Sequence, residues 1–177
     1  MFIPFFVQIV YGQQNSTFLS SAFVTSFIGI LLILTNREEN KKLNLQQAFL
    51  LTSLSWLSVA IFGCLPFLLS DLNLNFIDSF FESMSGITTT GSTIITDLDN
   101  APKGILIWRA ILQWLGGIGI IVMAITILPL LNIGGMQLFK LEGSDTTEKI
   151  LPKTREITLI ISSIYLLLTF LCGVSYW

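Results

Sequence analysis

Four long stretches without a charged side chain dominate this sequence. In chain order they cover residues 18–35, 43–70, 110–139 and 157–177. A run of about 18 or more apolar residues is long enough to cross the hydrocarbon core of a bilayer as a helix. Only 11% of the 177 residues are charged, against about 25% in an ordinary soluble domain. The sequence therefore predicts an all-α integral membrane protein.

The charged residues between these runs predict how the chain is oriented. Residues 36–42 hold three basic side chains and residues 140–156 hold four, whereas acidic side chains dominate residues 71–103. Short loops rich in lysine and arginine stay in the cytoplasm. We therefore expect the first and third clusters on the cytoplasmic side and the middle cluster outside.

The composition also argues against several classes of function. The sequence has no histidine, and its two cysteines, Cys64 and Cys172, lie in separate apolar runs. It contains no plausible nucleophile–base pair and no cluster of metal ligands, so we expect no enzyme and no cofactor. The net charge of −2 offers no broad basic surface for nucleic acid.

A short segment between two predicted crossings has helical periodicity but cannot span the membrane. In NFIDSFFESMSGI (Asn75–Ile87), six apolar residues recur at helical spacing: Phe76, Ile77, Phe80, Phe81, Met84 and Ile87. Apolar segments of this length are more often buried or re-entrant helices. We expect a re-entrant helix here, with Asp78 in its first turn, where the helix dipole favours an anion.

The uncharged segment GITTTGST (Gly86–Thr93) follows directly. Non-helical backbone at membrane depth is tolerated only where protein or a water-filled cavity satisfies it. The helix C-terminus attracts cations, and the backbone carbonyls that follow it can replace the hydration shell of an ion. Gly91 permits a backbone angle that turns its carbonyl toward a pore. The segment therefore favours a pore lining.

Two other interpretations of this segment remain. Gly86 and Gly91 have the spacing of a phosphate-binding Walker A loop, but Ser92 stands where that motif needs lysine, and a helix rather than a strand precedes it. A plain loop of serine and threonine turns between two helices is the second alternative. We favour the pore lining over both.

Several nearby residues have more than one possible role. Asp78 and Glu82, one turn apart, fit an acid–base pair, but we favour a dipole partner at the helix start and an outward-facing charge near a cation entrance. Arg109 either extends outward or pairs with one of these carboxylates. We expect Trp108 at the outer interface and Trp56 more deeply buried. The glycines at 116, 117 and 119 favour close helix packing over a hinge.

At this point the sequence resembles a known family. The stretch Phe76–Glu142 is similar to the first pore repeat of the TrkH/TrkG family of bacterial potassium-uptake proteins, part of the Trk/Ktr/HKT superfamily. SGITTTGST resembles the first filter loop of that family, and RAILQWLGGIGIIV followed by ILPLL and GGMQLF resembles its next helix and inner end. The resemblance implies a pseudo-fourfold pore built from four helix–pore-helix–helix repeats, each giving one filter segment.

The resemblance divides the chain into an N-terminal part, a pore repeat and the start of a second repeat. The assigned parts are a partial extra helix pair (1–36), a cytoplasmic loop (37–44), the first pore repeat (45–142) with its outer helix (45–70), re-entrant pore helix (75–87), filter loop (88–93) and inner helix (102–139), and a cytoplasmic connector with the first helix of a truncated second repeat (143–177). Within the connector, residues 143–155 are expected to be solvated.

The resemblance also implies a function. Thr89, Thr90, Gly91 and Ser92 would bind potassium, the transported ion, through their backbone carbonyls. The complete family protein would be a multi-pass homodimer in the bacterial inner membrane, docked to a cytosolic nucleotide-binding regulatory subunit.

This sequence holds only one filter segment. We therefore expect a fragment, or a product truncated at both ends, that does not transport alone. The alternative is a truncated, non-transporting membrane protein that assembles with or regulates a complete transporter.

Overall fold

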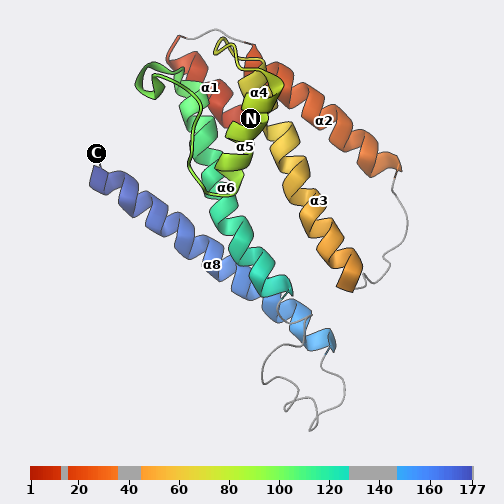
Figure 1. Cartoon of the computed structure of the whole chain (residues 1–177). Coiled ribbons are helices and arrows are strands. Elements are labelled where there is room, and N and C mark those ends of the chain that lie inside the picture. The colour runs from red at the N-terminus through yellow and green to blue at the C-terminus, as the bar shows by residue number, and fades with distance from the viewer. Residues whose placement is uncertain (13–15, 36–44, 128–146, 177) are drawn as a thin grey trace. The chain divides into compact units, whose positions relative to one another are not determined.

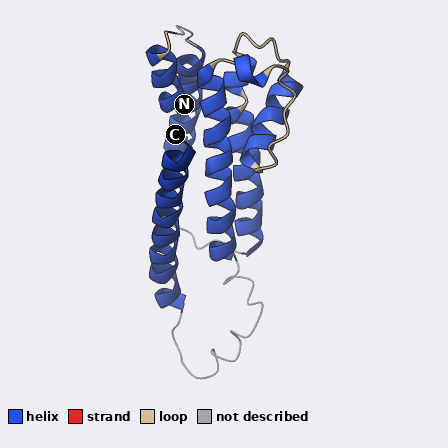
Figure 2. Ribbon diagram, turned by 90° about the vertical axis from the view of Figure 1, so that its left-hand side faces the viewer, coloured by secondary structure: helices blue, strands red, loops and turns tan. Residues whose placement is uncertain are grey.

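All regular structure in the described part of the chain is helical. The computed structural model describes residues 1–12, 16–35, 45–127 and 147–176, and these ranges contain helices and loops but no strand (Figure 2). Four helices are long and apolar enough to cross a membrane: Thr17–Thr35, Gln46–Leu68, Lys103–Ala124 and Glu156–Tyr176. The prediction of an all-α membrane protein is confirmed.

The chain divides into two compact units, Met1–Gly117 and Ile118–Trp177, which we describe separately. The first unit holds α1 (Phe2–Val10), α2 (Thr17–Thr35), α3 (Leu45–Gly63), α4 (Leu65–Leu68), α5 (Phe76–Ile87), the 3-10 turn η1 (Leu98–Asn100) and the first part of α6 (Lys103–Ile127) (Figure 1). The second unit holds the end of α6 and all of α8 (Thr147–Tyr176).

The second unit differs from expectation at one boundary. α8 begins at Thr147, so the part of the expected connector from there to residue 155 is helical. The predicted cytoplasmic loop at 37–44 and residues 128–139 of the predicted inner helix lie outside the described residues.

The outer helix, expected as one element over 45–70, is interrupted at Cys64. Pro66 has no amide hydrogen, and its ring would collide with the carbonyl four residues earlier in a continuous helix. α3 therefore ends at Gly63, and its last carbonyl loses its helical partner. The indole Nε1 of Trp108 on α6 donates to that carbonyl at 2.9 Å. A side chain from α6 thus provides the hydrogen bond that the break in the outer helix removes.

The short helix α5 begins at a defined cap and lies against two longer helices. The side chain of Asn75 accepts a hydrogen bond from the Asp78 amide at 2.9 Å, which satisfies one of the free amides at the helix start. α5 packs against α3. It also meets α6, where a side chain at Gly86 would lie 3.0 Å from Leu112. The loop after α5 runs back along α5 itself (Figure 2).

A buried core joins α2, α4, α6 and the segment after α5. It consists of Phe18, Phe67, Ile95, Ile105, Trp108 and Leu112. The rings of Trp108 and Phe18 meet edge to face, with centroids 6.3 Å apart. Trp108 is 6% exposed, whereas Trp56 is half-buried. Our expectation had the reverse order, because it could not foresee the acceptor that the α3 break offers inside the protein.

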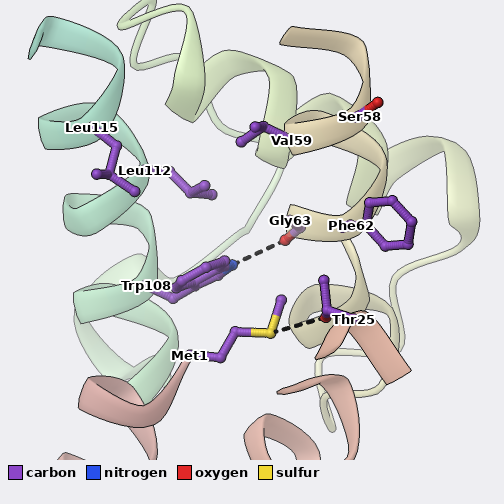
Figure 3. A pocket seen from close by; sticks show the side chains of 9 residues that line it. All are labelled: Met1, Thr25, Ser58, Val59, Phe62, Gly63, Trp108, Leu112 and Leu115. Atoms are coloured by element: carbon purple, nitrogen blue, oxygen red, sulfur yellow. Dashed lines mark hydrogen bonds between the residues drawn. The ribbon is translucent and has the colours of Figure 1, made fainter. Parts of the chain in front are cut away.

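An apolar hollow of about 270 Å³ lies beside this core (Figure 3). It is lined by Met1, Thr25, Ser58, Val59, Phe62, Gly63, Trp108, Leu112 and Leu115. Its lining includes no charged side chain and none of residues 88–93. Such a surface suits hydrocarbon and not an ion, so the functional site must be sought elsewhere.

The bond between Trp108 and Gly63 leads to a first prediction. Trp108→Phe keeps an aromatic ring in the core but leaves the buried carbonyl without a donor, which should cost about 1–3 kcal/mol of stability. Thermal unfolding of the chain in detergent, followed by circular dichroism, measures this loss. Trp56→Phe is the control and should unfold close to wild type. Equal stability of Trp108→Phe and wild type would contradict the role given to the bond.

Candidate ion-filter segment

Residues 88–93 continue directly from the C-terminus of α5. The helix ends in a Schellman motif: the Thr89 amide donates to the Gly86 carbonyl, and the Thr90 amide to the Ser85 carbonyl, both at 3.0 Å. The left-handed position of this motif usually holds glycine, but here it holds Thr89 at φ 58°. That backbone conformation is strained for a β-branched residue.

The carbonyls of the segment divide into free and bonded groups. Within the described residues, no hydrogen bond is made to the carbonyls of Thr89, Thr90 or Gly91. The Ser92 carbonyl, in contrast, accepts a hydrogen bond from the Ser85 hydroxyl at 2.6 Å. All residues from 88 to 93 are exposed on the surface of this unit. Three consecutive carbonyls are therefore available to a ligand, and the fourth is held against α5.

Gly91 is required by its backbone conformation and not by crowding. Its φ is +78°, a left-handed value that is costly for a residue with a side chain. A Cβ added there would meet no atom within 4 Å. The glycine therefore sets the path of the backbone while the space beside it stays open.

Gly116 on α6 marks where the inner helix comes closest to this segment. A Cβ at this position would lie 2.0 Å from the carbonyl oxygen of Ile87 and 3.2 Å from the methyl group of Thr89. No side chain fits there without movement of the backbone. The structure thus supports the close packing at Gly116 that the sequence favoured, with α6 lying directly against the end of α5 and Thr89.

The face of α5 that points into the protein is polar. Its buried residues include Ser79, Glu82, Ser83 and Ser85, whereas Phe76, Ile77 and Phe81 are exposed. Apolar residues at helical spacing normally mark the buried face of a helix, but of the six in α5 only Ile87 is buried. Ser83 packs where Gly63 has no side chain, since a Cβ there would lie 2.5 Å from its hydroxyl.

Glu82 joins α5 to the strand-like segment beyond the filter. One carboxylate oxygen accepts hydrogen bonds from the Thr93 hydroxyl at 2.6 Å and from the amides of Ile94 at 2.5 Å and Ile95 at 3.3 Å. The other oxygen lies 3.1 Å from Nε of Arg109 on α6, an ion pair whose atoms are not aligned as a hydrogen bond. One side chain therefore connects α5, residues 93–95 and α6.

This cluster changes two expectations drawn from the sequence. Glu82 is 1% exposed, so its interpretation as an outward-facing charge was wrong. The two possibilities for Arg109 are resolved in favour of pairing, because a buried carboxylate needs a compensating charge. Polar residues recur three and four positions apart at 79, 82, 83 and 85, and such spacing places them on one helix face. This spacing was the signal in the sequence for a polar face on α5.

The described residues offer no alternative cation site made of side chains. Within residues 1–12, 16–35, 45–127 and 147–176, no group of three or more histidine, cysteine, aspartate or glutamate residues is placed to hold a metal ion. Backbone carbonyls after a helix C-terminus are hard oxygen ligands suited to an alkali cation. The free carbonyls of this segment are therefore the groups in the described residues whose chemistry suits a cation.

The close approach at Gly116 leads to a second prediction. Gly116→Ala should destabilise the chain by about 1–3 kcal/mol, the usual cost of inserting atoms into a packed site. Thermal unfolding in detergent measures the change. Gly29→Ala on α2 is the matched control, because nothing lies within 4 Å of a Cβ there. A Gly116→Ala protein as stable as the control would mean that α6 does not pack here as described.

Comparisons with known proteins agree with this architecture. Residues 14–177 match the family model described as "TrkH: Cation transport protein". The chain is 41% identical to the Trk system potassium uptake protein TrkH of Escherichia coli K12, covering 100% of this chain and 38% of that protein. It is 42% identical to the Trk system potassium uptake protein TrkI of Halomonas elongata, with 100% and 36% covered. The chain thus spans less than two fifths of the length of these relatives.

A solved structure agrees as well. The crystal structure of the potassium transporter TrkH from Vibrio parahaemolyticus superposes with a TM-score of 0.85 and 38% identity, covering 99% of this chain and 35% of that one. These relatives and the four apolar helices identify a multi-pass protein of the bacterial inner membrane, in a family of transporters and not of enzymes. The chain belongs to the TrkH family of cation transport proteins.

Proposed function

We propose that this chain takes part in potassium transport across the membrane by contributing one of four filter segments of a Trk-type uptake system. The observation that carries the proposal is the row of free carbonyls at Thr89, Thr90 and Gly91, exposed directly after the C-terminus of α5. Relatives at 41–42% identity are named Trk system potassium uptake proteins, which supports potassium as the ion.

The assigned roles differ along the segment. The carbonyls of Thr89, Thr90 and Gly91 are the ion ligands. Ser92 belongs to the same filter segment, and one lone pair of its carbonyl accepts a hydrogen bond from the Ser85 hydroxyl. The negative end of the α5 dipole adds a favourable potential for a cation at this place.

One filter segment can surround an ion on one side only. The other sides must come from further repeats of the same kind, as the family resemblance implies. We propose that the complete protein is a homodimer in the bacterial inner membrane, and that a cytosolic nucleotide-binding subunit regulates it. Potassium is the substrate in this proposal and no cofactor is involved.

The assignment of Gly91 is tested in a complete transporter, a full-length Trk potassium uptake protein in which residues 1–177 replace the matching stretch. Gly91→Val should lower potassium uptake, and its preference over sodium, roughly tenfold, because left-handed backbone costs a side-chain residue about 1–2 kcal/mol. Uptake of both ions into a potassium-uptake-deficient strain provides the measurement.

Gly12→Val is the matched control. Gly12 also has a left-handed φ, of 69°, with nothing within 4 Å of a Cβ, but it lies outside the filter segment. Its uptake and ion preference should equal those of the unsubstituted transporter. If Gly91→Val behaves like Gly12→Val in both respects, the filter assignment fails.

A second test uses the 177 residues alone. Expressed in the same deficient strain, they should not restore growth at low potassium, because a single filter segment cannot enclose an ion. Membrane insertion of the chain is verified by fractionation. Restored growth would contradict this expectation and would mean that several copies assemble into a pore. The alternative role, a non-transporting partner of a complete transporter, also predicts no growth. Co-purification of the chain with a complete transporter would favour this alternative.

A further inference from the structure

We propose that Glu82 is a positioning residue for ion selectivity: it fixes the far end of the filter segment, and Arg109 keeps its carboxylate neutralised inside the protein. The inference rests on the proposed function, because it concerns the carbonyls assigned there to potassium. Glu82 itself touches no transported ion. It acts through the backbone of the segment that follows Gly91.

The filter segment is tied to α5 at both of its ends. At the near end, the carbonyl of Ser85 accepts the amides of Thr90 at 3.0 Å and Gly91 at 3.3 Å. At the far end, the carboxylate of Glu82 accepts the hydroxyl of Thr93 and two amides beyond it. The amides are thereby held on the protein side, and the free carbonyls are left on the open side.

The charge of Glu82 requires the partner on α6. A buried carboxylate is costly in a low-dielectric environment unless an opposite charge and hydrogen bonds compensate it. The fully buried side chain of Glu82 has both. Arg109, whose side chain is 9% exposed, provides the opposite charge, and the hydroxyl of Thr93 and the amides beyond it provide the hydrogen bonds. Three hydrogen bonds to an ionised acceptor are stronger than those to a neutral amide or carbonyl. The pair therefore makes the far anchor firm without leaving net charge behind the filter.

A firm anchor affects selectivity through the size of the ion. Carbonyls that replace the water around potassium must move inward to coordinate the smaller sodium ion equally well. A segment fixed at both ends resists that movement, so sodium is coordinated less well. If the hydrogen bonds to Glu82 are weakened, the carbonyls can move inward to coordinate sodium, and the preference for potassium falls.

A competing interpretation treats Glu82 as a charge that concentrates cations near the entrance. That role depends on exposure to solvent and on charge, whereas anchoring depends on the length of the side chain. Glu82→Asp separates the two, because it keeps the charge but is shorter by one methylene group. Asp78→Asn is the complementary control: it removes a half-buried carboxylate one turn earlier on the same helix and leaves the anchor intact.

The first experiment measures uptake of potassium and sodium by the complete transporter, normalised to the amount of protein in the membrane. Glu82→Asp should lower the potassium-to-sodium preference roughly tenfold, the effect of losing about one charge-assisted hydrogen bond, and Asp78→Asn should leave it unchanged. The opposite order would overturn the proposal in favour of an entrance charge. A transporter without substitutions that shows no potassium preference would instead count against the proposed function.

A second experiment does not depend on transport. Hydrogen–deuterium exchange of the 177-residue chain in lipid nanodiscs follows the amide of Ile94, which donates to Glu82. The amide of Ile95 is less informative, because it also donates to the Thr93 hydroxyl at 3.1 Å. Glu82→Ala should speed exchange at Ile94 at least tenfold relative to wild type, while α3 stays protected. Asp78→Asn should not change it. Unchanged exchange at Ile94 in Glu82→Ala would refute the anchor, whatever the uptake results.

Discussion

Polypeptide that is not helical must find hydrogen-bond partners for its amides inside the protein, because a bilayer has no water to provide them. The segment after α5 meets this constraint through acceptors on α5 itself. Ser85 and Glu82 accept its amides, and Arg109 balances the charge that this requires. On the inward polar face of α5, Glu82 and Ser85 provide the bonds to this segment.

This solution sorts the backbone into two sides. The amides of Thr90, Gly91, Ile94 and Ile95 are bonded to acceptors on α5, and the carbonyls of Thr89, Thr90 and Gly91 are left without a partner. These free carbonyls are the cation ligands of the proposed function. Gly116 completes the arrangement, since α6 can approach the end of α5 only without a side chain at that position.

The sequence predicted the helices well for a simple reason. Long uncharged runs can only be stable as membrane-crossing helices, and the apolar spacing from Phe76 onward is visible without any structure. The segment that we propose as a filter stood out by its polarity between two such helices. Three features could not be foreseen: the inward polar face of α5, the buried Trp108 and the strained Thr89. The first two depend on what lies opposite the residue in space, and apolar spacing does not say which helix face meets protein and which meets lipid. Thr89 is strained because it holds the left-handed position at the end of α5, which usually holds glycine.

What the sequence determined by itself is the class of molecule: membrane-crossing helices, a short helix between two of them, and an uncharged segment with Gly91 after it. Only the tertiary structure decided how that segment is held. Glu82, Thr93 and Arg109 are separated in the chain and meet through the packing of α5 against α6. A buried charge is tolerated only where its partners converge, and that convergence is a property of packing, which the order of residues along the chain does not display.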